Sequence, residues 1–455
     1  MSASTAVPQA ASNWKARLPR KLSIRRSKVA AVVLALLLRI LIDLSYVTIV
    51  QPLFAYAGYT LRVDWTNLCL SYVLVIAMGF LLPSKKQFPS ADITFIIFAI
   101  AYLPCTSFFA LQAGDPRYFV LFNLAFLVLC TTVAFVPCFR VPLNISHRLT
   151  LLLAITLVCT LYAVATVVMR GGLSLLSLDI TRVYEFRSEI NSRILTGLVG
   201  YDVEWVSKVF IPAMLVFGLW TNRKLVILGA ILLAVAFFAI TSAKGVLFYP
   251  ILTLIAYFGK LSGNFRIGFL LAAIAVPILS FITYFALHDI LVTGILLNRI
   301  YFVPTIANFQ YYDFFRVHPL VYWSNTFMSF FYENPYNDTI AVILGRSTNV
   351  QETDTYLNVG IFATGYMQFG VLGMLLFPLF AGLSLKVIDG LTVNRMPTHV
   401  ALSVSVVAGI QYLSADFTEP LLSHGMFAVW LTLYLMGRSD TSIASHSTAA
   451  TTVHN

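Results

Sequence analysis

Long apolar runs alternate with short polar segments along most of the chain, which is the pattern of membrane-spanning helices. Twelve runs come close to the ~20 residues that a helix needs to cross a bilayer, although the run at 245–259 is short. These predicted spans are residues 29–52, 66–83, 91–112, 117–137, 149–169, 204–220, 224–242, 245–259, 266–288, 360–386, 398–415 and 421–437. We therefore expect an all-α polytopic membrane protein with twelve transmembrane helices.

Two long stretches between these runs, residues 170–203 and 289–359, are predicted loops that contain short or amphipathic helices. Residues 1–28 form a polar, basic arm, residues 29–438 a single transmembrane domain, and residues 439–455 a tail without apolar periodicity that we expect to be disordered. Composition supports this class, because 59% of residues are hydrophobic and 11% are charged, against about 25% charged in soluble domains.

The positive charges are distributed unevenly between the two sides of the predicted membrane. Seven cations lie in the arm and eleven in the segments that alternate onto its side, which makes eighteen of the thirty Lys and Arg residues. The same segments carry only three of the nineteen acids, Asp92, Asp389 and Asp440. The positive-inside rule therefore predicts cytoplasmic termini and two long extracytoplasmic loops. The net charge of +11 follows this topology, so we expect no nucleic-acid partner.

Metal, disulfide and nucleotide chemistry have no support in the sequence. All five cysteines fall in predicted spans or at their ends, which disfavours a disulfide framework. The seven histidines show no i,i+4 pair and no adjoining cysteine cluster, and no glycine-rich phosphate loop is present. We predict no metal site and no cofactor.

The first long loop is rich in arginine on the side where the positive-inside rule predicts few cations. Its four arginines are Arg170, Arg182, Arg187 and Arg193. Guanidinium groups suit phosphate because their fixed donors match its oxygens and they stay charged. The alternative is local ion pairing with the acids of the same loop, Asp179, Glu185 and Glu189.

Other charged residues lie at or within predicted spans. Lys244 stands at an outward boundary between two spans, where it either snorkels to the surface or has a functional role. Arg39 and Asp43 form an i,i+4 pair in the first span, as do Glu204 and Lys208 in the sixth. Because each pair can neutralise itself inside the bilayer, we expect a structural role for both.

Aromatic residues crowd the first half of the second long loop, from Tyr301 to Tyr332. Such rings either anchor a segment at the headgroup level of the bilayer or stack on a planar or sugar ligand. Charged side chains are interspersed among them, namely Arg299, Asp313, Arg316 and His318. We interpret this stretch as an active-site loop that lies on the membrane surface.

Two strings in this region, NRIYFVPTIANFQYYDFFRVHP and NVGIFATGYMQFGVLGMLL, resemble the O-antigen polymerases, the oligosaccharide repeat-unit polymerases of bacterial surface polysaccharide assembly. In that group an Arg opens an aromatic segment with a Pro shortly after, and Asn-x-Gly leads into a span with Tyr-x-x-Phe-Gly-x-x-Gly. The matching positions are Arg299, Pro304, Asn358, Gly360, Tyr366, Phe369, Gly370 and Gly373. The family's small-Arg-Gly corner is similar to Ala243-Lys244-Gly245, with Lys in place of Arg.

The resemblance implies a metal-independent membrane glycosyltransferase of the GT-C-like class, without a cofactor, in the bacterial cytoplasmic (inner) membrane. Such an enzyme transfers a growing glycan from undecaprenyl pyrophosphate to a new lipid-linked repeat unit at the outer face. Its expected partners are the lipid-linked donor and acceptor, membrane lipids, and the pathway's chain-length regulator and flippase. The alternatives are a ligase that moves the polymer to a lipid core, and a polysaccharide flippase or other transporter.

This function assigns roles to residues of both loops. We expect the leaving pyrophosphate to be bound by Arg182, Arg187, Arg193, Lys244 and Arg299. Arg187 and Arg299 are also expected to be catalytic, and the candidates for the base are Asp313, His318 and Glu189. His318 precedes Pro319, so its alternative role is a capping or interfacial residue. The rings expected to bind glycan, or else to anchor the interface, are Tyr311, Tyr312, Trp323 and Tyr366.

Overall fold

The computed structural model describes residues 20–139, 141–142, 145, 147–172, 190–326, 328–348 and 356–437, and this part is helical without a strand. Eight of the described helices are long and apolar enough to cross a membrane: Ser27–Ala57, Pro89–Gln112, Pro116–Phe135, Arg148–Met169, Leu198–Trp220, Lys224–Thr241, Phe265–Phe285 and Ile361–Thr392. Three shorter apolar helices are Trp65–Leu81, Gly245–Leu261 and Thr398–Leu413. The all-α, multi-pass membrane class is thereby confirmed.

The elements up to the second long loop are, in chain order, α1 (Arg20–Ser45), η1 (Tyr46–Val50), α2 (Gln51–Phe54), η2 (Ala55–Ala57), α3 (Trp65–Leu81), α4 (Pro89–Ile97), η3 (Phe98–Tyr102), α5 (Leu103–Gln112), α6 (Pro116–Phe135), α7 (Arg148–Met169), η5 (Ile190–Ile194), α9 (Leu198–Trp205), η6 (Val206–Phe210), α10 (Ile211–Trp220), α11 (Lys224–Thr241), α12 (Lys244–Leu261) and α13 (Phe265–Phe285). They are followed by α14 (Ile290–Thr293), η7 (Gly294–Phe302), α15 (Val303–Phe315), α16 (Ile340–Thr348), α17 (Ile361–Thr392), α18 (Thr398–Gly409), η8 (Ile410–Leu413), α19 (Thr418–Leu422) and α20 (Met426–Met436).

Five π-helical segments are described, and proline explains the position of the four that lie within longer helices. The turns η1, η3, η6 and η7 end two residues before Pro52, Pro104, Pro212 and Pro304, respectively. Proline has no amide hydrogen and its ring clashes with the carbonyl four residues earlier, so a wider turn lets the helix continue. These helices remain continuous through the proline.

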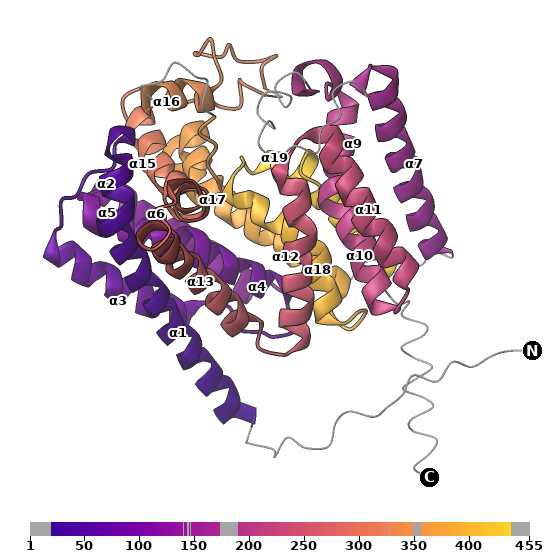
Figure 1. Ribbon diagram of the computed structural model, residues 1–455, viewed down its shortest axis with the longest axis horizontal. Coiled ribbons are helices and arrows are strands. Elements are labelled where there is room, and N and C mark those ends of the chain that lie inside the picture. Colours follow the sequence, from indigo (N-terminus) through magenta and orange to yellow (C-terminus); the bar gives the residue numbers. More distant parts are fainter. Residues whose placement is uncertain are drawn as a thin grey trace, which may run out of the picture.

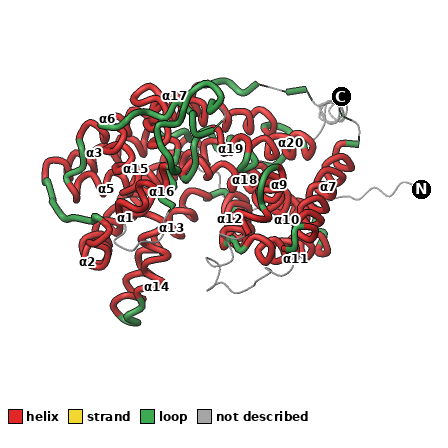
Figure 2. The backbone as a smooth tube through the Cα atoms, turned by 90° about the horizontal axis from the view of Figure 1, so that it is seen from above, coloured by secondary structure: helices red, strands yellow, loops and turns green. Residues whose placement is uncertain are grey.

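Most long helices run between two ends of the molecule (Figure 1). We call the end where α1 begins the basic end; it includes residues 82–90, 261–264 and 393–397. We call the opposite end, with residues 58–64, 113–115, 316–339 and 414–425, the loop end. In Figure 1 the loop end is at the top, and Figure 2 shows the helices from above, with the loops gathered over them.

The centre of the bundle is α4, in which every residue from Pro89 to Ile97 is buried. The long helix α17 packs against α6, where Phe362 contacts Phe122 with ring centroids 4.9 Å apart. Close approach of these helices depends on small residues, since a Cβ on Gly382 would lie 2.8 Å from Thr132 Cγ2. In contrast, α7 exposes a row of leucines at the periphery, as expected for a helix in contact with lipid.

The aromatic stretch after α13 differs from the prediction of a loop on the membrane surface. Residues 290–315 form one continuous helical segment, α14–η7–α15, that is packed into the protein. Leu297, Tyr301 and Phe302 have no exposed surface, and the Tyr301 hydroxyl donates to the Ala273 carbonyl of α13 over 2.8 Å. Most of these rings therefore fill the core and do not anchor an interface.

The last predicted span, residues 421–437, is also not one helix. Helix α19 ends at Leu422, and α20 begins only at Met426, after Gly425 in a left-handed conformation. The helix still reaches the basic end, where the Tyr434 hydroxyl donates to the Pro142 carbonyl. The spans predicted at 117–137, 149–169 and 224–242 agree closely with α6, α7 and α11. The arm up to residue 19, most of the first loop (173–189) and the tail from 438 lie outside the described residues.

Candidate functional site

A break in α17 organises the loop end. Phe369 (φ −137°, ψ 21°) and Gly370 (φ 60°, ψ −140°) leave helical geometry in the middle of the helix. A residue with a Cβ rarely adopts the Gly370 conformation. Across the break the backbone of Gly365 and Gly373 comes so close that a Cβ on Gly373 would lie 2.1 Å from the Gly365 carbonyl oxygen. The residues of the Tyr-x-x-Phe-Gly-x-x-Gly motif therefore interrupt the helical geometry of α17.

The break frees backbone carbonyls, and the second long loop satisfies them. Val321 N donates to the Met367 carbonyl over 3.0 Å, and Tyr322 N donates to the Gln368 carbonyl over 3.2 Å. The Gln368 side chain completes the contact by accepting from Trp323 N over 2.6 Å. Tyr322 and Trp323 adopt left-handed backbone conformations (φ 52° and 55°), which cost non-glycine residues energy and are common at functional sites. The loop is thus fastened to the interrupted helix.

A polar cavity of about 220 Å³ lies beside this junction. Its wall combines Asn358 of the Asn-x-Gly motif, Gln368 of the break, and Asp416 and Glu419 from the connection between α18 and α20. Non-helical backbone inside a membrane protein is tolerated where it lines a cavity or is buried in protein. Segments that are far apart in sequence therefore meet around one space.

The two carboxylates of the cavity have different surroundings. Asp416 is buried and accepts hydrogen bonds from Thr418 N (2.9 Å) and Thr418 Oγ1 (3.0 Å), from Gln368 Nε2 (3.3 Å) and from Trp323 Nε1 (3.4 Å). Burial raises the pKa of Asp416, and these donors limit the rise. Although Glu419 is exposed, crowding by protein atoms and then the nearby Asp416 carboxylate raise the pKa of Glu419, opposed by the Asp416 amide and by Lys208. Glu419 is therefore the more available proton acceptor.

An aromatic recess adjoins the polar cavity. It has a volume of about 510 Å³ and is lined by Tyr322, Trp323, Met328, Tyr332 and Phe369. Trp323 forms part of the wall of the recess. Trp323 also donates hydrogen bonds to Gln368 and Asp416, which line the polar cavity, so it lies between the two spaces. Aromatic faces of this kind pack against apolar chains and against the C–H faces of sugar rings.

The four predicted glycan-binding rings lie in different surroundings. Trp323 lines the aromatic recess, whereas Tyr311 is buried at the polar cavity and donates to the Leu357 carbonyl over 3.0 Å. Tyr312 and Tyr366 pack against each other with centroids 4.8 Å apart. The structure therefore brings Trp323 and Tyr311 to the α17 junction and places Tyr312 and Tyr366 beside another cluster.

That second cluster contains one of the predicted bases. Arg316 and Asp115 form an ion pair with 3.0 Å between Nη1 and Oδ2. Asp313 lies near both; partial burial and then the nearby Asp115 raise the pKa of Asp313, and Arg316 opposes the rise. The ring of His318 stacks on Phe314, and its Nδ1 lies 2.8 Å from the Phe314 carbonyl oxygen. A carbonyl only accepts, so Nδ1 carries a proton and Nε2 is left as the acceptor. This contact matches the capping alternative for His318.

The predicted phosphate-binding cations are only partly described. Arg182 and Arg187 lie outside the described residues, and so does Glu189; of Lys244 the structure describes the backbone at the start of α12. Arg299 is exposed on η7 and has no ionic or hydrogen-bonded partner in the described part of the chain. Arg193 is exposed on η5, which packs against α7 through Ile190 and Ile194, whereas η7 packs against α13. Convergence of the five cations stays a prediction.

The structure also shows the surroundings of the two charged pairs that were predicted within spans, Arg39–Asp43 and Glu204–Lys208. Asp43 pairs with Arg39 and accepts from Tyr72 (2.7 Å) and Ser107, while Arg39 donates to Ser71 and Thr106, so α1, α3 and α5 are tied together. Lys208 pairs with Glu204 over 2.5 Å and donates to Gln411. All of these partners belong to the protein, in agreement with the structural role expected for both pairs.

Gln368, Asp416 and Glu419 were not among the predicted site residues. Asp416 and Glu419 stand in a short connection between apolar helices, SADFTEP, and two acids there are a usable signal. Gln368 gives no such signal, because its role follows from the break at Phe369 and Gly370. Among the described residues no group of three or more His, Cys, Asp or Glu side chains could hold a metal ion. Comparisons of the chain with protein-family models, curated proteins and solved structures gave no match.

Proposed function

We propose that this protein is a membrane glycosyltransferase that joins lipid-linked oligosaccharide repeat units into a polysaccharide at the outer face of the bacterial cytoplasmic membrane. The observation that supports it most is the junction at the α17 break. There the two segments that resemble the O-antigen polymerases line one polar cavity together with Asp416 and Glu419. The first segment contributes Tyr311, and the second contributes Asn358 and Gln368. The undecaprenyl pyrophosphate carrier and the GT-C-like class belong to the same proposal.

The proposed reaction forms one bond and breaks one. The hydroxyl oxygen of the acceptor sugar attacks the anomeric carbon of the donor glycan, and the bond from that carbon to the pyrophosphate oxygen breaks. Glu419 takes the hydroxyl proton, for which its raised pKa makes it a stronger base than an ordinary glutamate. Asp416 positions Gln368 and Trp323 through its hydrogen bonds. The pyrophosphate leaves with the electron pair.

Cations stabilise the charge of the leaving pyrophosphate in this proposal. Arg299 is suited to this role because its guanidinium is exposed and has no partner in the described part of the chain. It lies on a nine-residue π-helical segment, a geometry that is frequent at functional sites. We keep Arg182, Arg187, Arg193 and Lys244 in the same role.

The proposal includes a twelve-span topology with both termini and the basic end in the cytoplasm. Long-range contacts support it, because they join segments that this topology places on the same side. At the loop end Arg316 pairs with Asp115, and Trp205 Nε1 donates to the Leu422 carbonyl. At the basic end Arg266 pairs with Asp92. In this topology residues 290–315 enter and leave at the loop end without crossing.

Reconstitution tests the proposed reaction. The purified protein is inserted into proteoliposomes with undecaprenyl-pyrophosphate-linked repeat units, and the products are separated by length on a gel. We expect a ladder of polymers that is absent with Arg299→Ala and present with Arg62→Ala, since Arg62 is an exposed arginine away from the cavity. A ladder in both variants would remove Arg299 from the mechanism, and no ladder with the unaltered protein would refute the polymerase.

The alternatives give different outcomes in the same system. A ligase transfers preformed polymer to a lipid core and does not lengthen it. A flippase moves lipid-linked units between leaflets without forming a glycosidic bond. Transporters place charged residues around a central cavity at mid-membrane depth. In this chain the cavity carboxylates lie in the short connection between α18 and α20 at the loop end, which favours surface chemistry.

A further inference from the structure

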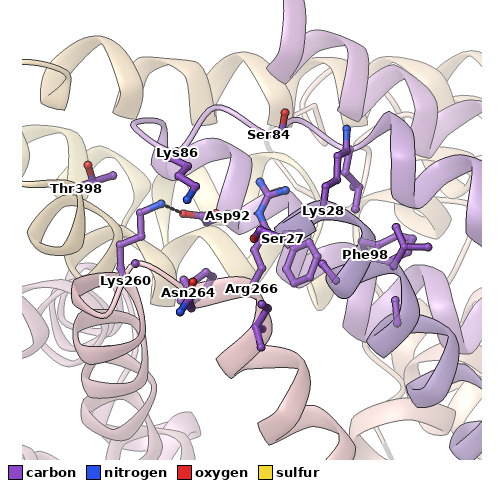
Figure 3. A pocket seen from close by; sticks show the side chains of 18 of the residues that line it. Ser27, Lys28, Ser84, Lys86, Asp92, Phe98, Lys260, Asn264, Arg266 and Thr398 are labelled. Carbon is purple, nitrogen blue, oxygen red and sulfur yellow. Dashed lines mark hydrogen bonds and ion pairs between the residues drawn. The ribbon is translucent and has the colours of Figure 1, made fainter. Parts of the chain in front are cut away.

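A second cavity, of about 290 Å³, lies at the basic end, on the opposite side of the molecule from the proposed reaction. Its walls come from α1, α3, α4, α12, α13 and the first residues of α18. Figure 3 shows four cationic side chains around it, those of Lys28, Lys86, Lys260 and Arg266. The proposed glycosyl transfer makes no use of this space.

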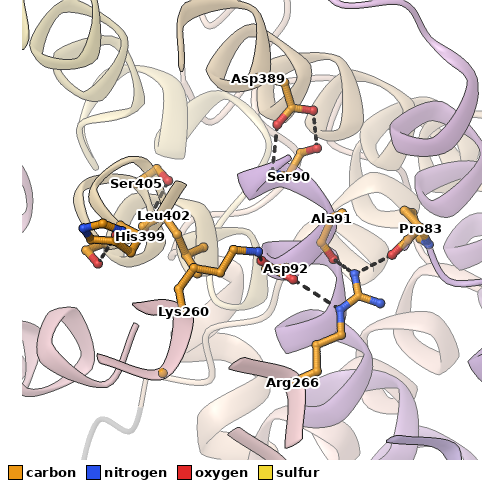
Figure 4. Close-up of polar contacts among 12 residues, drawn as sticks. Pro83, Ser90, Ala91, Asp92, Lys260, Arg266, Asp389, His399, Leu402 and Ser405 are labelled. Atoms are coloured by element: carbon orange, nitrogen blue, oxygen red, sulfur yellow. Dashed lines mark hydrogen bonds and ion pairs between the residues drawn. The ribbon is translucent and has the colours of Figure 1, made fainter. Parts of the chain in front are cut away.

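The charges of the cavity are not balanced by the protein. Of the described residues that line it, only Asp92 is acidic. Asp92 pairs with Lys260 and, over 3.2 Å, with Arg266 Nε (Figure 4). Four cations against one carboxylate leave a net charge of +3, concentrated at one opening.

The excess charge resides mainly on two lysines. Lys28 Nζ donates to the Phe80 carbonyl over 2.6 Å and has no carboxylate partner in the described chain. Lys86 is exposed and likewise has no ionic partner among the described residues. Asp389, the other acid near α4, is occupied by Lys386 (2.9 Å) and Ser90. An external anion would neutralise the remaining positive charge of Lys28 and Lys86.

Arg266 is held in a fixed position, which makes the site preformed. Its Nη2 donates to the carbonyls of Pro83 and Ala91 (Figure 4). Its guanidinium also lies over the Phe95 ring, 5.1 Å from the ring centroid. A positioned guanidinium beside two flexible lysines suits the oxygens of a phosphate group.

The cavity is also amphipathic. Its apolar wall is formed by buried side chains such as Ala31, Val32, Ala35 and Phe98, whereas Ser84 and Lys86 are exposed to solvent. Small residues on α1 leave room along this wall. The arrangement matches a molecule with a phosphate headgroup and acyl chains better than it matches a free ion, since an ion makes no use of the apolar wall.

We propose that this cavity binds a phosphate-bearing anion, and that its source is the headgroup of an anionic lipid from the leaflet next to the basic end. Lys28 and Lys86 provide the charge that is not already neutralised. Arg266 provides Nη1, the part of its fixed guanidinium that does not bond Asp92, Pro83 or Ala91, and the wall formed by α1 receives an acyl chain. Basic pockets between membrane helices are known lipid-headgroup sites as a class.

Native mass spectrometry of the full-length protein, titrated with dioleoyl phosphatidylglycerol in detergent, tests the site. We expect the Lys28→Gln/Lys86→Gln double variant to bind about 25-fold more weakly, from roughly a fivefold loss for each cation. The control is Lys85→Gln, because Lys85 is equally exposed but does not line the cavity. Both variants keep the basic arm, so lipid bound there does not change the comparison. Size-exclusion chromatography checks that each variant is folded.

Two further measurements distinguish the sources of the phosphate. With a lipid, Ala31→Leu fills the apolar wall and weakens phosphatidylglycerol binding, and inorganic phosphate does not compete. With a free ion, inorganic phosphate raises the melting temperature of the unaltered protein but not of the double variant, and Ala31→Leu has no effect. Equal phosphatidylglycerol binding by the double variant and the unaltered protein, with no stabilisation of either by phosphate, would overturn the proposal.

Discussion

Asp416 and Glu419 are three residues apart, yet they are equipped for different tasks. Four hydrogen bonds hold the carboxylate of Asp416, and they fix Trp323 and Gln368 in return. Glu419 lines the same cavity but is exposed to solvent. Paired acidic groups whose environments separate their roles are a common arrangement in active sites.

Replacement of Glu419 by Gln should reduce the rate of polymerisation by about 100-fold or more, the usual range for loss of a general base. A base acts only when deprotonated, so the activity should fall as the pH decreases through the pKa of Glu419. Because that pKa is raised, the fall should occur above the pH range of an ordinary glutamate. Initial rates across pH measure both effects.

In Glu419→Gln the residual activity should no longer fall as the pH decreases through this range; we call this fall the acidic limb of the pH profile. Asp416→Asn is the comparison: as a positioning change it should weaken the Trp323 contact and leave the acidic limb in place. A Glu419→Gln variant with full activity and an unchanged pH profile would exclude Glu419 as the base.

Arg39 illustrates a charged residue whose role is structural. It is fully buried, and its carboxylate partner Asp43 belongs to the same helix. Arg39→Ala would leave the partly buried Asp43 without a counter-charge, so we expect a loss of up to about 3–5 kcal/mol in the free energy of unfolding. Arg39→Met with Asp43→Asn should recover part of it, since neither charge remains. Thermal unfolding in detergent, with exposed Arg117→Ala as a control, measures the difference.

At the scale of elements, the break in α17 depends on one glycine. Gly370→Ala places a Cβ on a backbone at φ 60°, ψ −140°, which should cost about 1–3 kcal/mol. Because Val321 and Tyr322 are bonded to the carbonyls at the break, the strain should also loosen the loop. We expect faster hydrogen exchange at residues 321–323.

Gly268 provides a matched control within another membrane helix. A Cβ at Gly268 would meet nothing within 4 Å, so Gly268→Ala should be neutral or should stabilise α13 by about 0.5–1 kcal/mol. Equal exchange at residues 321–323 in both variants would show that the loop does not depend on the break.

The sequence predicted elements well where an uninterrupted apolar run marks a membrane-length helix. The runs define α6, α7 and α11 nearly to the residue, and the run at 91–112 matches the buried helix Pro89–Gln112 as closely. The helical segment 290–315 was missed as a packed element because Asn298, Arg299 and Asp313 lower its hydropathy. Its neighbours are protein side chains, which accept polar groups that lipid would not.

The candidate site was less predictable for a topological reason. Tyr311, Gln368 and Glu419 come from three segments that are far apart in sequence, and the backbone break beside the cavity that they share is a tertiary feature. Asp313 and His318 were chosen as bases because they lie among aromatic residues, but that spacing does not specify that Asp313 lies on α15 and His318 in the turn after it. The cavity carboxylates became candidates only when the connections between helices could be placed.

At the scale of the whole molecule, the cavities at the two ends have opposite electrostatic character. The basic end joins Lys28, Lys86, Lys260 and Arg266 around one cavity. The polar cavity at the loop end contains two carboxylates, Asp416 and Glu419, and no cation among its described lining residues. A basic cavity at one end and a carboxylate-bearing cavity at the other are compatible with the orientation that we propose from the positive-inside rule.

Single cysteines test this orientation in a background without the five native cysteines. Ser262→Cys lies between α12 and α13 at the basic end, and Ser329→Cys lies in the second long loop; both positions are exposed. A membrane-impermeant maleimide applied to spheroplasts should label Ser329→Cys at once and Ser262→Cys only after permeabilisation. The reverse pattern would place the polar cavity on the cytoplasmic side. There it would be accessible to sugar nucleotides, but not to lipid-linked repeat units in the outer leaflet. Labelling of both cysteines without permeabilisation would place the two ends on the same side of the membrane and would contradict the twelve-span topology.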